Sequence, residues 1–190
     1  MTLLKYPLAL LCSFAVCLQA AAAQCSYAAL MIDPLSAARA DVYVGRGKHV
    51  EVFFTNEAAT QAVETFPEST LEIRHIEAGT VCEIDGGIWV RDAVYLSLNE
   101  EVLIAKQFSG SSESLSFYDT RTCALKGQVD ISDRAWSIES EGLLAGEQCA
   151  NSQLRTCKRT VVHRWDRDCQ AGSSEESIAP PPGAVPMGRR

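Results

Sequence analysis

The chain has 190 residues, with 24 acidic against 17 basic side chains and a formal net charge of −7 at neutral pH. So acidic a chain argues against nucleic acid as a partner, because phosphates attract basic surfaces. Beyond the first 23 residues no segment is apolar for long enough to form a membrane-spanning helix, which argues against an integral membrane protein.

Residues 1–23 have the pattern of a signal peptide. Lys5 gives a weakly basic start, Leu8–Leu18 is apolar, and the alanines at 20–23 provide the small residues of a cleavage site before Gln24. Eleven apolar residues are too few for a permanent membrane helix. We therefore expect a soluble periplasmic or secreted protein. The alanine-rich leader and the absence of an N-x-S/T sequon after it favour a bacterial envelope.

The first part of the mature chain predicts a strand and one short helix. Residues 27–32 are apolar, and the alanine-rich stretch 34–40 could add a further helical turn. His49–Thr55 has the composition of a strand. Asn56–Phe66 places apolar residues at helical spacing, can be capped by Asn56, and is stopped by Pro67. This stretch is the predicted short N-terminal helix.

Beyond Pro67 the apolar residues recur with a period of two, which is typical of strands. Turn residues separate these short segments almost to the end of the chain, as in a meander of antiparallel hairpins. The predicted strands are Thr70–Ile76, Thr80–Ile84, Ile88–Arg91, Ala93–Leu98, Val102–Phe108, Ser114–Tyr118, Lys126–Ile131, Ala135–Glu139 and Thr156–Trp165. The sequence thus predicts an all-β, mostly antiparallel fold.

Residues 93–131 resemble one blade of a YVTN-type β-propeller. Asn99–Glu101 matches that family's first turn, Ser109–Ser112 its polar link, and Asp119-Thr120 the end of its third strand. The resemblance implies a propeller-like repeat of blade-like hairpins. A closed propeller needs about four blades, and the chain has room for about three such units, so an open arrangement is favoured.

The predicted organisation is a signal peptide over 1–23, a single domain over 24–169 and a disordered tail over 170–190. The domain has 146 residues, a size that suits one domain. The tail is rich in serine, glutamate and proline, with little to bury.

Six cysteines remain after the leader is removed, and an even number in an exported chain predicts up to three disulfide bonds. Only Cys149–Cys157 is favoured by proximity in the sequence. This bond would close a nine-residue loop, and loop-closure entropy predicts that it stabilises the folded protein by roughly 2.6 kcal/mol. Cys82–Cys123 with Cys25–Cys169 is one of three arrangements of the rest. The absence of any C-x₂-C pair argues against a zinc site.

Charge is unevenly distributed. Between residues 51 and 147 there are 18 acids and 6 bases, whereas residues 155–167 carry five bases and one acid. This layout could steer a charged partner, but pairing of the basic strand with the acidic body of its own fold explains it as well.

Few residues carry a chemical signal. Gly45–Lys48 could contact an anion but fits a hairpin turn better. His75, Glu77 and Asp85 form the best candidate metal or acid–base cluster, without the spacing of a known ligand set. The three tryptophans (Trp89, Trp136 and Trp165) fit core positions better than an aromatic binding strip. Ser109–Ser114 is a polar loop of the kind that often carries binding residues.

These observations predict an exported binding protein of the bacterial envelope, more plausibly without catalytic activity, cofactor or metal. Its expected partner is another envelope or secreted protein. One alternative is an inhibitor or immunity-type protein against a secreted enzyme. A second is a metal-dependent hydrolase that uses the region of His75, Glu77 and Asp85.

Overall fold

The computed structural model describes residues 25–56 and 63–178, and side chains up to Gly172. Within these ranges the chain forms fifteen strands and one short 3-10 helix. The strands are β1 (Tyr27–Ala29), β2 (Ile32–Ser36), β3 (Arg39–Arg46), β4 (Val50–Thr55), β5 (Thr65–Pro67), β6 (Leu71–His75), β7 (Val81–Ile84), β8 (Ile88–Ser97), β9 (Val102–Ser109), β10 (Ser112–Asp119), β11 (Leu125–Asp130), β12 (Ala135–Ile138), β13 (Gly142–Glu147), β14 (Arg159–Trp165) and β15 (Ala171–Ile178), and the helix is η1 (Leu154–Thr156).

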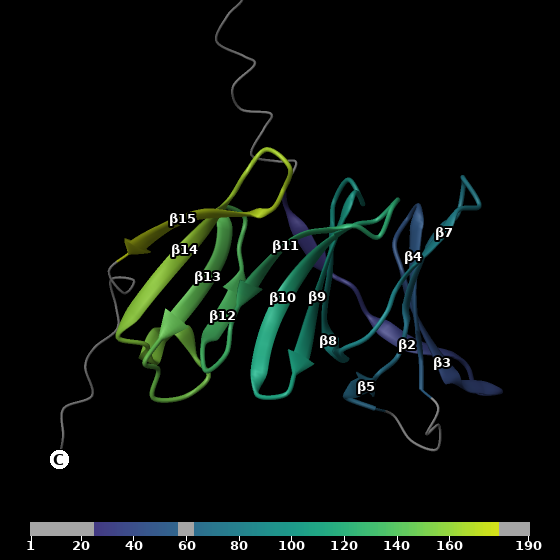
Figure 1. The fold of residues 1–190 in the computed structure, drawn as a ribbon, viewed down its shortest axis with the longest axis horizontal. Coiled ribbons are helices and arrows are strands. Elements are labelled where there is room, and N and C mark those ends of the chain that lie inside the picture. Colours follow the sequence, from purple (N-terminus) through teal and green to yellow (C-terminus); the bar gives the residue numbers. More distant parts are fainter. Residues whose placement is uncertain (1–24, 57–62, 179–190) are drawn as a thin grey trace, which may run out of the picture.

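The strands form three antiparallel sheets that follow one another along the molecule (Figure 1). The N-terminal sheet has the order β2-β3-β4-β6-β7. The central sheet has the order β1-β8-β9-β10-β11, with β5 added beside β8, and the C-terminal sheet has the order β12-β13-β14-β15. The predicted all-β, disulfide-linked single domain is confirmed.

The central sheet separates two hydrophobic cores. Leu103 and Ala105 of β9 belong to the core shared with the N-terminal sheet, whereas Ile104 and Val102 belong to the core shared with the C-terminal sheet. A strand that is buried on both faces needs no polar face, so its sequence is a continuous apolar run. This explains why Val102–Ala105 does not alternate.

The predicted helix over Asn56–Phe66 is not shown. Its last residues are instead extended: Phe66 lies in β5 opposite Trp89 of β8, and Val63 is in no regular element. Phe66 stacks on Phe54 with 4.7 Å between ring centroids, so tertiary packing decides its conformation. Residues 57–62 lie outside the described residues. The alanine-rich stretch 34–40 is not helical either, since it contains the hairpin between β2 and β3.

Part of the segment predicted as a disordered tail is a strand. Residues 171–178 form β15, which pairs with β14 and completes the C-terminal sheet. Its polar composition hides this role, because the main-chain hydrogen bonds to β14 need no apolar side chains. Residues 1–24, which include the predicted signal peptide, and 179–190 lie outside the described residues.

Two of the three disulfide bonds join different sheets. Cys82 of β7 bonds to Cys123 in the turn after β10, which links the N-terminal sheet to the central one. Cys25, before β1, bonds to Cys169, in the connection between β14 and β15, which links the central sheet to the C-terminal one. The third, Cys149–Cys157, closes the short loop before β14.

Candidate functional site

The residues of the candidate metal cluster lie apart. The ring Nδ1 of His49 lies 3.0 Å from the carboxylate of Glu77, whereas Asp85 accepts a hydrogen bond from the Thr70 hydroxyl at 3.4 Å. His75 lies at the end of β6, and among the described residues no hydrogen bond or ion pair joins its side chain to either acid. Among the described residues, no group of three or more histidines, cysteines and acids could hold a metal ion. The geometry therefore gives the predicted hydrolase site no support.

The segment Gly45–Lys48 comprises the last two residues of β3 and the first two of the hairpin turn to β4. Gly47 donates its N–H to the carbonyl of Val50 at 2.8 Å, which closes the turn. The backbone N–H of Lys48 also binds an anion, but an internal one: the carboxylate of Glu100, at 2.5 Å. The turn is thus an element of the fold.

The tryptophans do not form a binding strip. Trp89 is fully buried in the core beside the N-terminal sheet, where its indole N–H donates to the carbonyl of Ser69 at 2.7 Å. Trp136 and Trp165 pack from the C-terminal sheet against the other core, next to Tyr95 and Phe117 respectively. The rings therefore lie on two sides of the central sheet.

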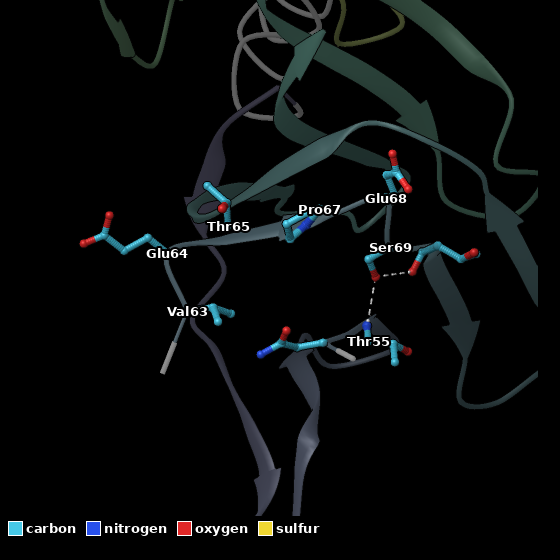
Figure 2. Close-up of a pocket in the computed structure, with 9 residues that line it drawn as sticks. Thr55, Val63, Glu64, Thr65, Pro67, Glu68 and Ser69 are labelled. Carbon is cyan, nitrogen blue, oxygen red and sulfur yellow. Dashed lines mark hydrogen bonds between the residues drawn. The ribbon is translucent and has the colours of Figure 1, made fainter. Parts of the chain in front are cut away.

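One hollow lies between the end of β4 and strand β5 (Figure 2). It measures about 750 Å³ and is lined by the carboxylates of Glu64 and Glu68 together with several hydroxyl groups. The hydroxyl of Ser69 is already engaged: it accepts the N–H of Thr55 at 2.9 Å and donates to the carbonyl of Thr70 at 3.1 Å. No histidine or lysine is among the described lining residues, so the hollow shows no nucleophile–base pair.

The hairpin between β9 and β10 presents an exposed polar tip. Ser109 pairs with Ser112, so Gly110 and Ser111 alone form the turn. Gly110 has a φ of 62°, which glycine adopts without a steric penalty. The four residues from 109 to 112 are all exposed, so a partner can contact their hydroxyl and backbone groups directly.

Side-chain contacts hold the stem of this hairpin in place. The Gln107 amide donates to the Ser116 hydroxyl at 2.8 Å, and the Gln128 amide donates to both Ser116 at 3.1 Å and Ser114 at 2.8 Å. These bonds cross three neighbouring strands of the central sheet. On the other face, Lys106 and Glu113 form an ion pair of 2.7 Å. The tip therefore projects from a rigid base.

The basic segment near the C-terminus is only partly neutralised by the acidic body. Arg159 pairs with Glu147 at 3.3 Å, and Arg164 lies 3.9 Å from Glu141. Arg155, Lys158 and Arg167 have no ion pair with described residues. Arg155 and Lys158 lie before the start of β14, and Arg167 lies after its end. At a strand rise of about 3.3 Å per residue, β14 separates the two groups by about 20 Å, so they do not form one basic surface.

These observations define a class of protein: a disulfide-linked β-sheet scaffold that presents an exposed polar hairpin tip on a braced stem. Among the described residues, no helix is long and apolar enough to cross a membrane.

Comparison with known proteins identifies the family. A family model described as "Immune protein Tsi1" matches residues 25–169. The chain is also 34% identical over 155 residues to the immune protein Tsi1 of Pseudomonas aeruginosa strain PAO1, in an alignment that covers 80% of this chain and 90% of that protein. The chain therefore belongs to the Tsi1 immune protein family.

This match corrects the predicted resemblance to a β-propeller. The family that covers the chain is that of Tsi1, and no propeller-repeat model matches. The strands within residues 93–131 do form an antiparallel meander, from β8 to β11, but β1 and β5 extend the same sheet. Short strands and polar turns at blade-like spacing occur in any meander, so they did not distinguish the two architectures.

Some site features gave no signal in the sequence. Gln107 and Gln128 are twenty-one positions apart, and only the pairing of β9, β10 and β11 brings both to the serines of β10. Glu100 likewise meets the turn before β4 only in the folded protein. The polar loop at Ser109–Ser114 was visible because its composition differs from that of the strands around it.

Proposed function

We propose that this chain is an immunity protein: it binds a secreted toxin and blocks its action in the bacterial envelope. The observation that carries the proposal is the match of residues 25–169 to the Tsi1 immune protein family. A binding role needs a rigid surface and no reactive group of its own, and the scaffold described above suits that requirement.

Two features support an envelope location. The leader predicted over residues 1–23 would direct export, and six cysteines are paired in three disulfide bonds. Disulfide bonds persist in oxidising compartments such as the periplasm. The toxin that this protein meets would accordingly act outside the cytosol.

Within this function, we assign the exposed tip at residues 109–112 as a contact point for the toxin. A two-residue turn on a braced hairpin costs little conformational entropy on binding, because its backbone is already ordered. Its serine hydroxyls can donate and accept hydrogen bonds, so they can meet polar groups of a partner.

The function is tested by protection of growth. A toxin encoded beside this chain's gene is directed to the periplasm of a heterologous bacterium, with and without the full-length chain. We expect growth to be restored by the full-length chain and not by a version that lacks residues 1–23. Failure to protect, together with no binding of the purified proteins in titration calorimetry, would overturn the proposal.

The contact point is tested with matched substitutions. Ser111→Arg places a bulky charged side chain at the hairpin tip and should weaken toxin binding at least about tenfold, or about 1.4 kcal/mol. Ser140→Arg makes the same change in the exposed turn between β12 and β13 and should leave affinity unchanged. Equal affinities for the two variants would exclude the tip from the interface without affecting the immunity function itself.

A further inference from the structure

A second hollow lies where the edges of the central and C-terminal sheets meet. Strand β11 is the last strand of the central sheet, β15 is the last strand of the C-terminal sheet, and the two contact each other. The hollow measures about 370 Å³, which is within the range of small-molecule sites. Its polar lining residues are Lys126, Gln128, Asp130, Arg134, His163 and Gln170.

His163 is the buried polar group of this hollow. Its side chain comes from β14, opposite Leu143 of β13, and the residue is 7% exposed. The ring Nε2 is buried and has no hydrogen-bond partner among the described residues. An unpaired buried polar atom destabilises the folded protein, so a ligand that supplied its partner would offset part of that cost.

Irregular pairing occurs in both sheets beside the hollow. In the central sheet, Phe117 pairs with Gly127 and Tyr118 with Leu125, so Lys126 is the extra residue of a bulge in β11. In the C-terminal sheet the register of β14 and β15 shifts just after His163. Bulges change the direction of side chains and are frequent at sheet edges next to binding sites.

The charged lining favours an anion. Among the described lining side chains are two cations, Lys126 and Arg134, and one carboxylate, that of Asp130. The cations each have one ion pair elsewhere, Lys126 with Asp119 at 3.8 Å and Arg134 with Glu147 at 3.3 Å. An ammonium has three donors and a guanidinium five, so one contact leaves further donors on each.

We propose that this hollow is a binding site for a small organic carboxylate. Lys126 and Arg134 would attract the carboxylate, and the His163 ring, with its proton on Nε2, would donate a hydrogen bond to it from the buried side. The small residue Gly127 leaves room for the ligand: a Cβ added there would approach only Gln170, with its Oε1 at 3.4 Å. The proposal does not rest on toxin binding, since none of the tip residues 109–112 lines this hollow.

The test is a titration of the isotopically labelled mature protein with sodium succinate, followed by NMR of the histidine rings. Sodium chloride at matched ionic strength is the reference. The chain has three histidines, and the signal of His163 is assigned by its loss in His163→Gln. We expect succinate, and not chloride, to shift the His163 ring signals in a saturable manner while those of His49 and His75 stay in place.

Three variants that change residues other than His163 test the site itself. Lys126→Gln should weaken succinate binding about tenfold, the value of one charge-assisted contact. Gly127→Val fills the hollow and should abolish the shift, whereas Lys158→Gln removes an exposed cation just before β14, outside the hollow, and should change nothing. The proposal is overturned if succinate and chloride act alike, or if Lys126→Gln and Gly127→Val bind as the wild type does.

Discussion

Glu100 accepts a hydrogen bond from the backbone N–H of His49 at 2.7 Å, across the boundary between two sheets. Glu100 lies in the turn between β8 and β9 of the central sheet, and His49 lies just before β4 of the N-terminal sheet. The other carboxylate oxygen accepts the N–H of Lys48. A Cβ on Gly47 would lie 2.8 Å from the same carboxylate, so glycine permits this close approach.

Replacement of Glu100 should therefore loosen the contact between these sheets. Glu100→Ala leaves two backbone N–H groups without their acceptor, and hydrogen bonds to charged groups contribute about 1.5–3 kcal/mol each. Because water can reach part of this turn, we expect a loss of about 1–3 kcal/mol in the free energy of unfolding, measured by urea titration. Glu141→Ala, which removes an exposed carboxylate, should change it by less than about 0.5 kcal/mol. Equal losses would contradict this role.

The three disulfide bonds should contribute differently to the free energy of unfolding, according to the length of the loop that each closes. Their sequence separations are 144, 41 and 8 residues for Cys25–Cys169, Cys82–Cys123 and Cys149–Cys157. Loop-closure entropy then predicts losses of about 5, 4 and 2.6 kcal/mol when each pair is replaced by alanine. Denaturant titration of the three double variants, each with its other bonds oxidised, measures this order. A smaller loss for Cys25–Cys169 than for Cys149–Cys157 would refute it.

Stability should fall in acid partly through Asp119. Burial tends to raise the pKa of this carboxyl, but hydrogen bonds from the hydroxyl and N–H of Thr122 and the N–H of Arg121, together with nearby Lys126, outweigh it and lower the pKa. A carboxyl with a lowered folded-state pKa stabilises the protein above its unfolded-state pKa of 3.8. That contribution is lost as the pH falls through the lower folded-state value.

Asp119→Asn should remove this part of the acid response. We expect the difference in unfolding free energy between wild type and variant to be constant from pH 7 to about pH 5 and to shrink below about pH 4. Urea titrations at several pH values measure the difference. A difference that grows as the pH falls would contradict the assignment, and Asp92→Asn, at an exposed site, serves as the control for a general charge effect.

Trp89 should be more costly to replace than Trp136. It packs near Phe54 and Tyr118, with ring centroids at 6.4 and 6.2 Å, and its N–H satisfies the carbonyl of Ser69. Trp89→Phe removes both volume and the donor, so we expect a loss of about 2–4 kcal/mol. Trp136→Phe, at a partly exposed ring, should cost less than about 1.5 kcal/mol. Thermal unfolding followed by circular dichroism distinguishes them, and equal costs would argue against a core role for Trp89.

The sequence predicted the class of fold because its main signals are local. Turn residues between short apolar segments predict hairpins without knowledge of how the sheets pack on one another. The hairpin of β9 and β10 is an example. Proximity alone also favoured Cys149–Cys157, the pair present in the structure. The other two pairings had equal alternatives in the sequence, since only the packing of sheets brings Cys25 to Cys169 and Cys82 to Cys123.

The incorrect predictions have the same origin. The helical spacing up to Phe66 is a local pattern, yet pairing with Trp89 and stacking on Phe54 make this residue part of a strand. The polar composition after Gln170 suggested a tail, yet backbone pairing with β14 recruits residues 171–178. The predicted metal cluster of His75, Glu77 and Asp85 is not supported by the geometry, because residues that are near in sequence need not point their side chains toward one point.

By itself, the sequence indicated an acidic β protein with up to three disulfide bonds and little sign of catalysis, because composition, alternation and cysteine number can be read along the chain without the fold. Only the tertiary structure decided that one sheet is buried on both faces, that Glu100 caps a turn of another sheet, and that His163 lies in a hollow with Lys126 and Arg134. Those relationships join residues far apart in sequence, and burial and hydrogen bonding between sheets select them only once the whole domain has folded.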